Sequence, residues 1–307
     1  MIKVENLTKK FGDITAVENI SFDVGESEIF GFLGPNGAGK TTTIRILATL
    51  ISPTSGKITI DGRDIKSDSD YVRSIIGLLT ESPGMYEKLS AYENLDYYSS
   101  FYDIPADRRR SNIEKYLKMF DLWDRKDDPA GTFSKGMKQK LTLSRALIHE
   151  PKILFLDEPT AGLDPESAHM VRTFIENLKE EKITVFLCTH NLEEASSLSD
   201  RVCIINRKII RIATLSELQN SDKNKRVEII FKDNALRYTE LLKEFKEVKD
   251  IQTNNNRVLA LVEKPEITNP LIIKKLIDNG AGIIYFNEIK ATLEEIYLDL
   301  IKNEEEK

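Results

Sequence analysis

The N-terminal part of the chain contains two kinds of hydrophobic pattern, continuous apolar runs and apolar residues at helical spacing. The runs 29–33 and 153–156 are continuously apolar, which is typical of strands buried in the centre of a sheet. Between them, Ile113, Tyr116 and Leu117 recur on one face at the spacing of a helix. Strands interleaved with amphipathic helices predict an α/β fold for this part of the chain.

Two regions depart from this alternation. Segments 2–11 and 20–24 have the pattern of strands with no helix between them, so we expect an antiparallel β layer beside the α/β core. The stretch 89–150 instead carries mainly helix signals, because Ser90 begins a capping-box pattern and Ser134 is a favourable N-cap. We expect a helical subdomain there, inserted between strands of the core.

The pattern changes again after about residue 214. The segment 215–218 is compatible with a short helix, and the polar stretch behind it has the composition of a linker. Residues 226–307 then give the order β-α-β-β-α-β, which is that of a split βαβ unit, followed by a last helix. The predicted organisation is a large domain at 1–214, a linker at 215–225 and a small α+β domain at 226–307.

Composition narrows the class of protein. The chain has 44 Lys and Arg against 50 Asp and Glu, and a net charge of −6 argues against a general nucleic-acid-binding surface. Its N-terminus lacks the apolar stretch of a signal peptide, and no window of 18 apolar residues predicts a membrane span. Cys188 and Cys203 lie in apolar runs without metal-type spacing, so we expect them to be buried thiols.

The strongest chemical signal lies between the strand at 29–33 and the amphipathic helix behind it. The sequence GPNGAGKTT contains the pattern G-x-x-x-x-G-K-[ST], in which backbone N–H groups and a helix N-terminus surround phosphates. The alternative, a glycine-rich turn that binds nothing, is disfavoured by the complete strand–loop–helix context. Lys40 would place a charge between the outer phosphates, and Thr41 would ligate Mg²⁺. The candidate phosphate-binding residues are Gly34, Pro35, Asn36, Gly37, Ala38, Gly39, Lys40, Thr41 and Thr42.

Polar residues follow two further apolar strands. Asp157 and Glu158 end the run 153–156, at the sheet edge where open α/β folds bind ligands. Asp157 would hold Mg²⁺, and Glu158 would polarise the attacking water. His190 ends the next strand and would bond the γ-phosphate or that water, although a single histidine at a strand end is often incidental.

Two other features have less specific interpretations. Ser134 and Gly136 open a helix, whose N-terminus is a second candidate anion site. Phe11 ends the first strand and is placed to stack on a nucleobase, although an aromatic residue there is more often part of the core.

These motifs, taken together and in this order, resemble the ATP-binding cassette family over residues 2 to about 214. GPNGAGKTT resembles Walker A, ILFLDE at 153–158 resembles Walker B, and FSKGM at 133–137 resembles the signature commonly written LSGGQ. AGLD at 161–164 resembles the D-loop, which adds Asp164 to the nucleotide-contacting residues. The resemblance makes His190 the switch histidine and Phe11 the adenine-stacking aromatic.

Two positions depart from the family pattern. Lys135 stands where a second glycine is common in the signature. Glu81 aligns with a loop position that usually carries glutamine, and its carboxylate would reach Mg²⁺ through water while adding negative charge near the phosphates. Both departures concern how the site is tuned rather than whether it binds ATP.

The resemblance implies a P-loop ATPase that uses ATP and Mg²⁺ and acts as a peripheral subunit at the cytoplasmic face of the membrane. Two such subunits would stack as a homodimer and drive a separate integral membrane permease. The wording FSKGMKQ and the C-terminal extension look most like exporters of the daunorubicin-resistance type. The alternative is a soluble cassette ATPase that acts on ribosomes or nucleic acid. A GTPase or kinase is disfavoured, because neither class carries the signature and D-loop patterns.

Overall fold

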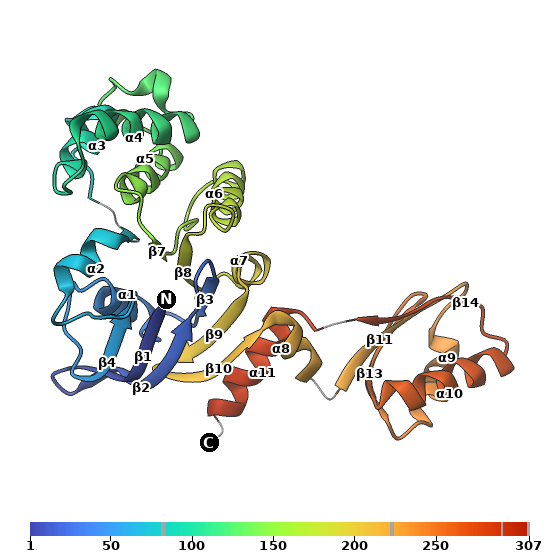
Figure 1. Ribbon diagram of the computed structural model, residues 1–307. Coiled ribbons are helices and arrows are strands. Elements are labelled where there is room, and N and C mark those ends of the chain that lie inside the picture. The colour runs from blue at the N-terminus through green and yellow to red at the C-terminus, as the bar shows by residue number, and fades with distance from the viewer. Residues whose placement is uncertain (81–83, 222–223, 290, 306–307) are drawn as a thin grey trace. The chain divides into compact units, whose positions relative to one another are not determined.

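The computed structural model describes residues 1–80, 84–221, 224–289 and 291–305, and it divides into two compact units, Met1–Ala213 and Thr214–Lys307. Figure 1 draws the course of the chain through both of them. Among the described residues, the first unit has two sheets and two hydrophobic cores, and the second has one sheet and one core.

A six-stranded sheet with the order β10-β9-β3-β8-β7-β6 forms the centre of the first unit. The five strands from β9 to β6 pair in parallel, and β3, β7 and β8 are buried along their whole length. Parallel strands are covered on both faces, which explains why these segments are continuously apolar in the sequence. The strands are β3 (Ile29–Leu33), β6 (Ile76–Leu79), β7 (Ile153–Asp157), β8 (Thr184–Thr189), β9 (Arg201–Asn206) and β10 (Lys208–Thr214).

The expected antiparallel layer is a second sheet of the order β2-β1-β4-β5. Strand β2 begins at Ile14 and not at residue 20, because Ile14, Thr15 and Val17 also pair with β1. The register of β1 against β2 shifts at three places, which removes the simple alternation that would have announced this longer strand. The strands are β1 (Ile2–Phe11), β2 (Ile14–Val24), β4 (Ser55–Ile60) and β5 (Arg63–Asp64).

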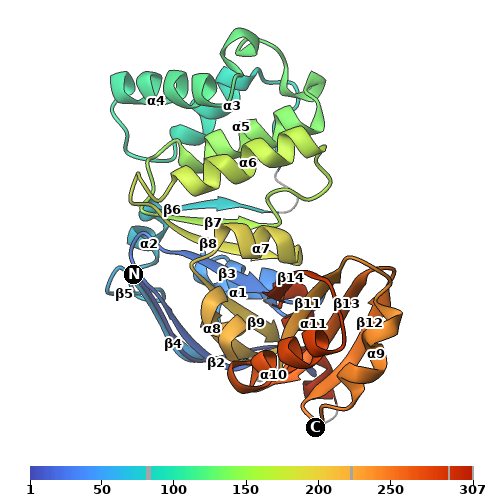
Figure 2. The same ribbon diagram turned by 90° about the vertical axis from the view of Figure 1, so that its right-hand side faces the viewer.

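Helices cover both faces of the six-stranded sheet. Figure 2 shows α3, α4 and α5 gathered on the side that α6 covers, with α1 on the opposite side. Ser90 and Glu93 form the predicted capping box of α3, and Ser134 caps α5 through the backbone N–H of Met137. The sequence did not predict α2. The helices are α1 (Lys40–Leu47), α2 (Ser69–Ile75), α3 (Ala91–Ser99), α4 (Ala106–Met119), α5 (Lys135–Leu147), α6 (Pro165–Asn177) and α7 (Leu192–Leu198), with 3-10 turns η1 (Trp123–Arg125) and η2 (Ala130–Thr132).

Two apolar cores lie on the two faces of the six-stranded sheet. Phe30 and Phe32 of β3 point into the core shared with α1 and the antiparallel sheet, and their rings pack against Phe22 and Phe186. Ile29 points to the other side, into the core built with α3–α6. This alternation of one strand between two cores fixes the strand's register, because a slip of one residue would exchange the faces.

The second unit contains the predicted β-α-β-β-α-β order and folds as one antiparallel sheet, β12-β13-β11-β14. Buried residues of α9 and α10 pack on the same face of that sheet, against Val227, Ile229 and Phe231 of β11. The elements are β11 (Asn224–Phe231), α9 (Leu236–Lys243), β12 (Val248–Asn254), β13 (Arg257–Glu263), α10 (Pro265–Asp278) and β14 (Ile283–Ile289).

The short helix predicted at 215–218 is present and extends further, so little of the segment 215–225 is the linker that the sequence predicts. Helix α8 (Leu215–Ser221) occupies most of it, and β11 begins within it. The helix packs against α11 (Leu293–Glu305), with Leu218 and Leu293 buried and Gln219 Nε2 donating to the carbonyl of Ala291 at 3.1 Å. The polar composition of this segment gives no sign in the sequence of the apolar contact that Leu218 makes.

Candidate nucleotide-binding site

A cavity of about 400 Å³ in the first unit brings together residues from five separated parts of the chain. They are the turn from β1 into β2, the loop before α1, the segments that follow β7 and β8, and the residue between β9 and β10. It is lined by Phe11, Ile14, Thr15, Ala16, Pro35, Asn36, Gly37, Ala38, Gly39, Lys40, Thr41, Thr42, Glu158, Ala161, His190 and Arg207. The cavity therefore contains most of the residues that the sequence predicts for a nucleotide.

Lys40 is the charged group at the base of this cavity. Its side chain is 6% exposed, and Nζ donates to the carbonyl of Gly34 at 2.7 Å and to that of Pro35 at 3.2 Å. Nζ also lies 3.8 Å from Glu158 Oε1. A buried ammonium beside the N-terminus of α1 makes the loop strongly attractive to an anion. Gly34 itself is not among the lining residues but holds Lys40 through its carbonyl.

Gly39 shows why the loop requires glycine at its last position. Its φ of +99° lies in the left-handed region, and it is the N-cap of α1. A Cβ at this position would lie 2.6 Å from the carbonyl oxygen of Ala16 and 2.9 Å from Val17 Cγ2. Only glycine allows the loop to approach β2 this closely while the helix begins at Lys40.

Glu158 and His190 are placed together as a pair. His190 Nδ1 lies 2.8 Å from Glu158 Oε1, and the hydroxyl of Thr189 lies 3.5 Å from Glu158 Oε2. Glu158 is 12% exposed, whereas the imidazole is 59% exposed. Glu158 has a φ of +52°, a conformation that costs free energy for a residue with a side chain. A strained, nearly buried carboxylate that faces the predicted phosphate-binding loop is well placed to polarise water.

The residues predicted for Mg²⁺ fit that ion chemically. Thr41 lines the cavity, and Asp157 is buried at the carboxyl end of β7. Their hydroxyl and carboxylate oxygens are the hard donors that Mg²⁺ prefers, and Mg²⁺ usually keeps water and phosphate as further ligands. In the residues that the structure describes, no three His, Cys, Asp or Glu side chains could hold a metal by themselves. The protein thus offers part of a coordination shell that a nucleotide would complete.

Phe11 is not part of the core. Its side chain is 49% exposed and lines the cavity. Lys9 Nζ lies 4.7 Å from the centroid of its ring. An exposed aromatic ring at the mouth of the cavity is available for stacking on a base.

Ser134, Gly136 and Asp164 are not among the residues that line this cavity. Ser134 caps α5, and Asp164 caps α6 by accepting hydrogen bonds from the backbone and side chain of Ser167 at 2.9 and 2.7 Å. The Ser167 backbone N–H, and then its hydroxyl, lower the pKa of Asp164. A Cβ at Gly136 would collide with Ser167 Oγ, so the two helix starts lie against each other. These three predicted residues form a separate group within the same unit.

Lys135 connects the signature segment to the D-loop. Its Nζ lies where a side chain at Gly162 would project, and Gly162 has a φ of +65°. Gln139, one turn further along α5, donates from Nε2 to the carbonyl of Pro159 at 2.6 Å. The lysine that departs from the family pattern thus takes up space that the D-loop glycine leaves free.

Some site residues lie outside the described part of the chain or were missed by the sequence. Glu81 lies outside the described residues, so its role stays a prediction. Thr15, Ala16 and Arg207 line the cavity without having been predicted. Arg207 reaches it because its backbone N–H donates to the carbonyl of Ala38, a contact between distant segments that no local pattern announces.

The two cysteines are buried, as predicted. Cys188 and Cys203 are free thiols without exposed surface, and burial raises the pKa of both. They belong to the core behind the cavity.

The fold and the cavity define an ATP-binding cassette. The family described as ABC transporter matches residues 17–161, and the C-terminal domain described as ATP-binding protein DrrA1-3-like matches residues 214–301. The chain belongs to the family of ABC transporter ATP-binding proteins, which are ATPases. In the described residues, no helix is both long enough and apolar enough to cross a membrane.

Relatives of known name narrow the resemblance. The ABC transporter ATP-binding protein NatA of Bacillus subtilis is 37% identical over 77% of this chain and 99% of its own length. The bacitracin transport ATP-binding protein BcrA of Bacillus licheniformis is 34% identical over 98% of this chain and 97% of its own length. The daunorubicin resistance ATP-binding protein DrrA3 of Streptomyces coeruleorubidus is 36% identical over 76% of this chain and 74% of its own length.

Solved structures of cassettes share the fold of the first unit. An ATP-binding subunit of an ABC transporter has a TM-score of 0.66 and 28% identity over 72% of this chain and 92% of that one. A dimeric cassette in a post-hydrolysis state, bound to ADP and Pi, has a TM-score of 0.64 and 28% identity over 70% of this chain and 99% of that one.

Proposed function

We propose that this chain is the ATP-hydrolysing subunit of an ABC exporter. The observation that carries the proposal is the arrangement of Lys40, Glu158 and His190 around one cavity that the phosphate-binding loop lines. This arrangement supports hydrolysis of ATP to ADP and phosphate, with Mg²⁺ as the metal.

Each group in the cavity has a separate task in this proposal. Lys40 and the backbone N–H groups of the loop bind the β- and γ-phosphates. Glu158 accepts a hydrogen bond from the attacking water, and His190 fixes the direction of that carboxylate. Thr41 and Asp157 would hold Mg²⁺, which neutralises charge on the phosphates when it is bound. Phe11 would stack on the adenine.

A second copy of the chain is needed to complete the site. Ser134, Gly136 and Asp164 lie together at the starts of α5 and α6, apart from the cavity that holds Lys40 and Glu158. Two chains stacked head to tail would bring these residues of one chain to the nucleotide of the other. The dimeric state of a related cassette with ADP and Pi supports this arrangement.

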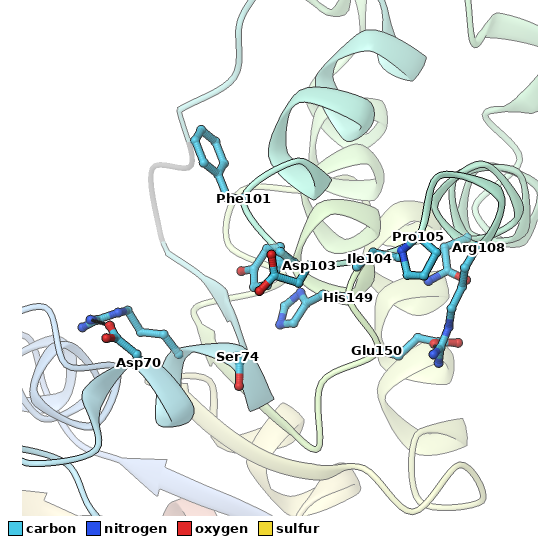
Figure 3. A pocket seen from close by; sticks show the side chains of 12 residues that line it. Asp70, Ser74, Phe101, Asp103, Ile104, Pro105, Arg108, His149 and Glu150 are labelled. Atoms are coloured by element: carbon cyan, nitrogen blue, oxygen red, sulfur yellow. Dashed lines mark hydrogen bonds and ion pairs between the residues drawn. The ribbon is translucent and has the colours of Figure 1, made fainter.

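The permease would dock on another side of the first unit. A cavity of about 710 Å³ between α2 and the helical subdomain is lined by Arg73, Phe101, Arg108, His149 and Glu150, among others (Figure 3). Phe101 is 67% exposed beside it. A hollow with a large exposed aromatic side chain at its rim is the kind of surface that binds another protein.

This docking face is also connected to the loop that follows β6. The carbonyl of Gly84 accepts hydrogen bonds from the hydroxyl of Tyr98 at 3.2 Å and from Arg145 Nη1 at 2.5 Å. The guanidinium of Arg145 also lies 4.6 Å from the ring centroid of Tyr98. A partner that moves α3 would therefore pull on this loop.

The names of relatives support a proposal for the class of cargo. Proteins named for bacitracin transport, daunorubicin resistance, linearmycin resistance and Nod factor export are 32–36% identical to this chain. We propose that the cargo is an antibiotic-like or lipid-like compound, exported by a permease whose cytoplasmic face this subunit occupies.

The test is the ATPase rate of the full chain, with and without its permease reconstituted in lipid vesicles. Phe101→Ala should lower the stimulation by the permease and leave the basal rate unchanged. The matched control is Met119→Ala, which alters an exposed apolar residue of the same subdomain that does not line this cavity. Hydrolysis that responds to ribosomes or nucleic acid, and not to the permease, would contradict the proposal.

A further inference from the structure

Glu194 is a buried carboxylate close to Glu158 and His190. It belongs neither to the phosphate-binding loop nor to the residues predicted to bind Mg²⁺. It lies in the first turn of α7 and is 1% exposed, whereas Glu193 beside it is exposed. The side chain of Asn191 caps the helix by accepting from the backbone N–H groups of both glutamates, at 3.0 and 3.1 Å. The carboxylate of Glu194 is thereby directed inward by a capped helix start.

The first contact of this carboxylate reaches the segment that carries Glu158. Glu194 Oε1 accepts a hydrogen bond from the hydroxyl of Thr160 at 2.8 Å. Thr160 lies within a turn in which the carbonyl of Glu158 accepts from the backbone N–H of Ala161 at 3.2 Å. A hydrogen bond that holds Thr160 therefore also limits the movement of Glu158, two residues away.

A second link reaches the segment that carries His190. Asn191 directly follows His190, and its side chain accepts the backbone N–H of Glu194 at 3.1 Å. The hydroxyl of Thr189, which directly precedes His190, lies 3.5 Å from Glu158 Oε2. The Thr189 hydroxyl oxygen also accepts the backbone N–H of Asn191 at 3.0 Å, which fixes the turn from β8 into α7. Glu194 is thus joined by its carboxylate to the turn that carries Glu158 and by its backbone to the turn that carries His190.

Keeping a carboxylate here costs free energy. Burial raises the pKa of Glu194, the nearby charge of Glu158 adds to that effect, and Arg172 of α6 opposes it. An apolar side chain would fill the same space without that cost. The geometry supplies a reason for the carboxylate, because its Oε1 accepts the hydrogen bond of the Thr160 hydroxyl, which an apolar side chain cannot do.

We propose that Glu194 is a positioning residue for ATP hydrolysis, which holds the turn of Glu158 to the start of α7, directly behind His190, through the hydroxyl of Thr160. The inference rests on the roles proposed above for Glu158 and His190. It predicts that loss of the acceptor slows hydrolysis without weakening the binding of ATP, since Glu194 does not line the nucleotide cavity.

The test compares kcat and KM for ATP in the full chain carrying Glu194→Ala, Glu194→Gln or Thr160→Val. Glu194→Ala and Thr160→Val should each lower kcat at least about tenfold and leave KM within about threefold. Glu194→Gln keeps a carbonyl oxygen for Thr160 and should restore kcat to within about threefold of the parent. The double variant Glu194→Ala/Thr160→Val should be no slower than either single variant, because both changes remove one interaction. The matched control is Glu193→Gln, which should behave as the parent does.

Three results would overturn the inference. They are a Glu194→Ala chain with the parent's kcat, a Glu194→Gln chain as slow as Glu194→Ala, and a change confined to KM. If Glu194→Ala does not fold, Thr160→Val decides the question alone, with the same expected loss. Hydrolysis that survives Glu158→Gln would overturn the proposed catalytic role and this inference together. Loss in Glu158→Gln with full activity in Glu194→Ala and Thr160→Val would overturn this inference alone.

Discussion

The two units of the chain are both sheets covered by helices, but they differ in what they bury. The first unit buries Lys40, Asp157 and Glu194, which are charged groups that cost free energy when they leave water. In the second unit, among the residues that the structure describes, Thr268 is the polar side chain that is buried, and the core is otherwise apolar. The first unit therefore keeps buried charges that lower its stability, whereas the described core of the second unit does not.

The positions of the buried polar groups sharpen this contrast. Lys40, Asp157 and Glu194 lie on or beside the edge of the six-stranded sheet where Glu158 and His190 meet. No similar group interrupts the described sheet of the second unit. We therefore propose that the first unit carries out the chemistry and that the second has a contact or regulatory role. Each prediction below tests this division of roles.

The largest expected effect concerns Glu158. Glu158→Gln should lower kcat at least about a hundredfold, because an amide cannot accept the proton of the attacking water, while ATP still binds. Phosphate release measures the rate, and titration with a fluorescent ATP analogue measures binding. A variant with near-normal phosphate release would remove the catalytic task from this site.

The next effect concerns Lys40. Lys40→Ala should lower ATP affinity or turnover at least about tenfold, roughly 1.4 kcal/mol, because the loop loses its buried ammonium. The same titration and rate assay measure both quantities. The control is Lys138→Ala, a partly exposed lysine on α5 that pairs with Glu87 and does not line the cavity. Normal turnover in Lys40→Ala would show that the phosphates bind elsewhere.

A smaller effect concerns the loss of folding stability at acid pH. The part of this loss that histidines cause should arise in the first unit, because all three histidines lie there. His149 donates from Nε2 to the carbonyl of Ile76 at 2.8 Å, stacks on Tyr102, and buries Nδ1 without a partner. Burial lowers its pKa to about 4. Below about pH 6.5 the unfolded chain binds a proton that the folded chain refuses, so stability falls as pH falls from there towards 4.

This acid effect can be isolated with one variant. His149→Gln should remove about 1 kcal/mol of the stability that the parent loses between about pH 7 and pH 5.5. Urea unfolding of parent and variant at both pH values gives this double difference, in which the lost stacking cancels. An identical loss in both proteins would show that His149 already titrates normally.

The smallest effect concerns removal of the second unit. A fragment of residues 1–213 should bind ATP within about threefold of the full chain, because every lining residue of the nucleotide cavity belongs to the first unit. Circular dichroism checks that the fragment folds. A folded fragment that no longer binds ATP would make the second unit part of the site and end the proposed division.

The sequence predicted those parts of the molecule that depend on local signals. The phosphate-binding loop, the buried strands, the capping box of Ser90 and the N-cap of Ser134 each depend on a few adjacent residues. The order of elements in the second unit followed from the same patterns. The family resemblance then assigned roles to motifs that lie far apart in the sequence. Taken singly, these motifs had indicated only candidate site residues.

What the sequence could not predict depends on contacts between distant segments. The first half of β2 is stabilised by pairing with β1, and α8 by Leu218 and its contact with α11. Arg207 lines the cavity and Glu194 lies behind it, each held by hydrogen bonds to residues distant in the sequence. Neither residue belongs to a motif, so only the folded arrangement draws attention to it.

The most direct test of the central claim measures the mass of the Glu158→Gln chain by analytical ultracentrifugation, with and without ATP and Mg²⁺. The claim is that one chain supplies the cavity and a second supplies Ser134 and Gly136. It predicts a doubled mass only when ATP is present, and the double variant Lys40→Ala/Glu158→Gln should not show this doubling. A chain that binds one ATP and keeps the mass of a single copy would contradict the account.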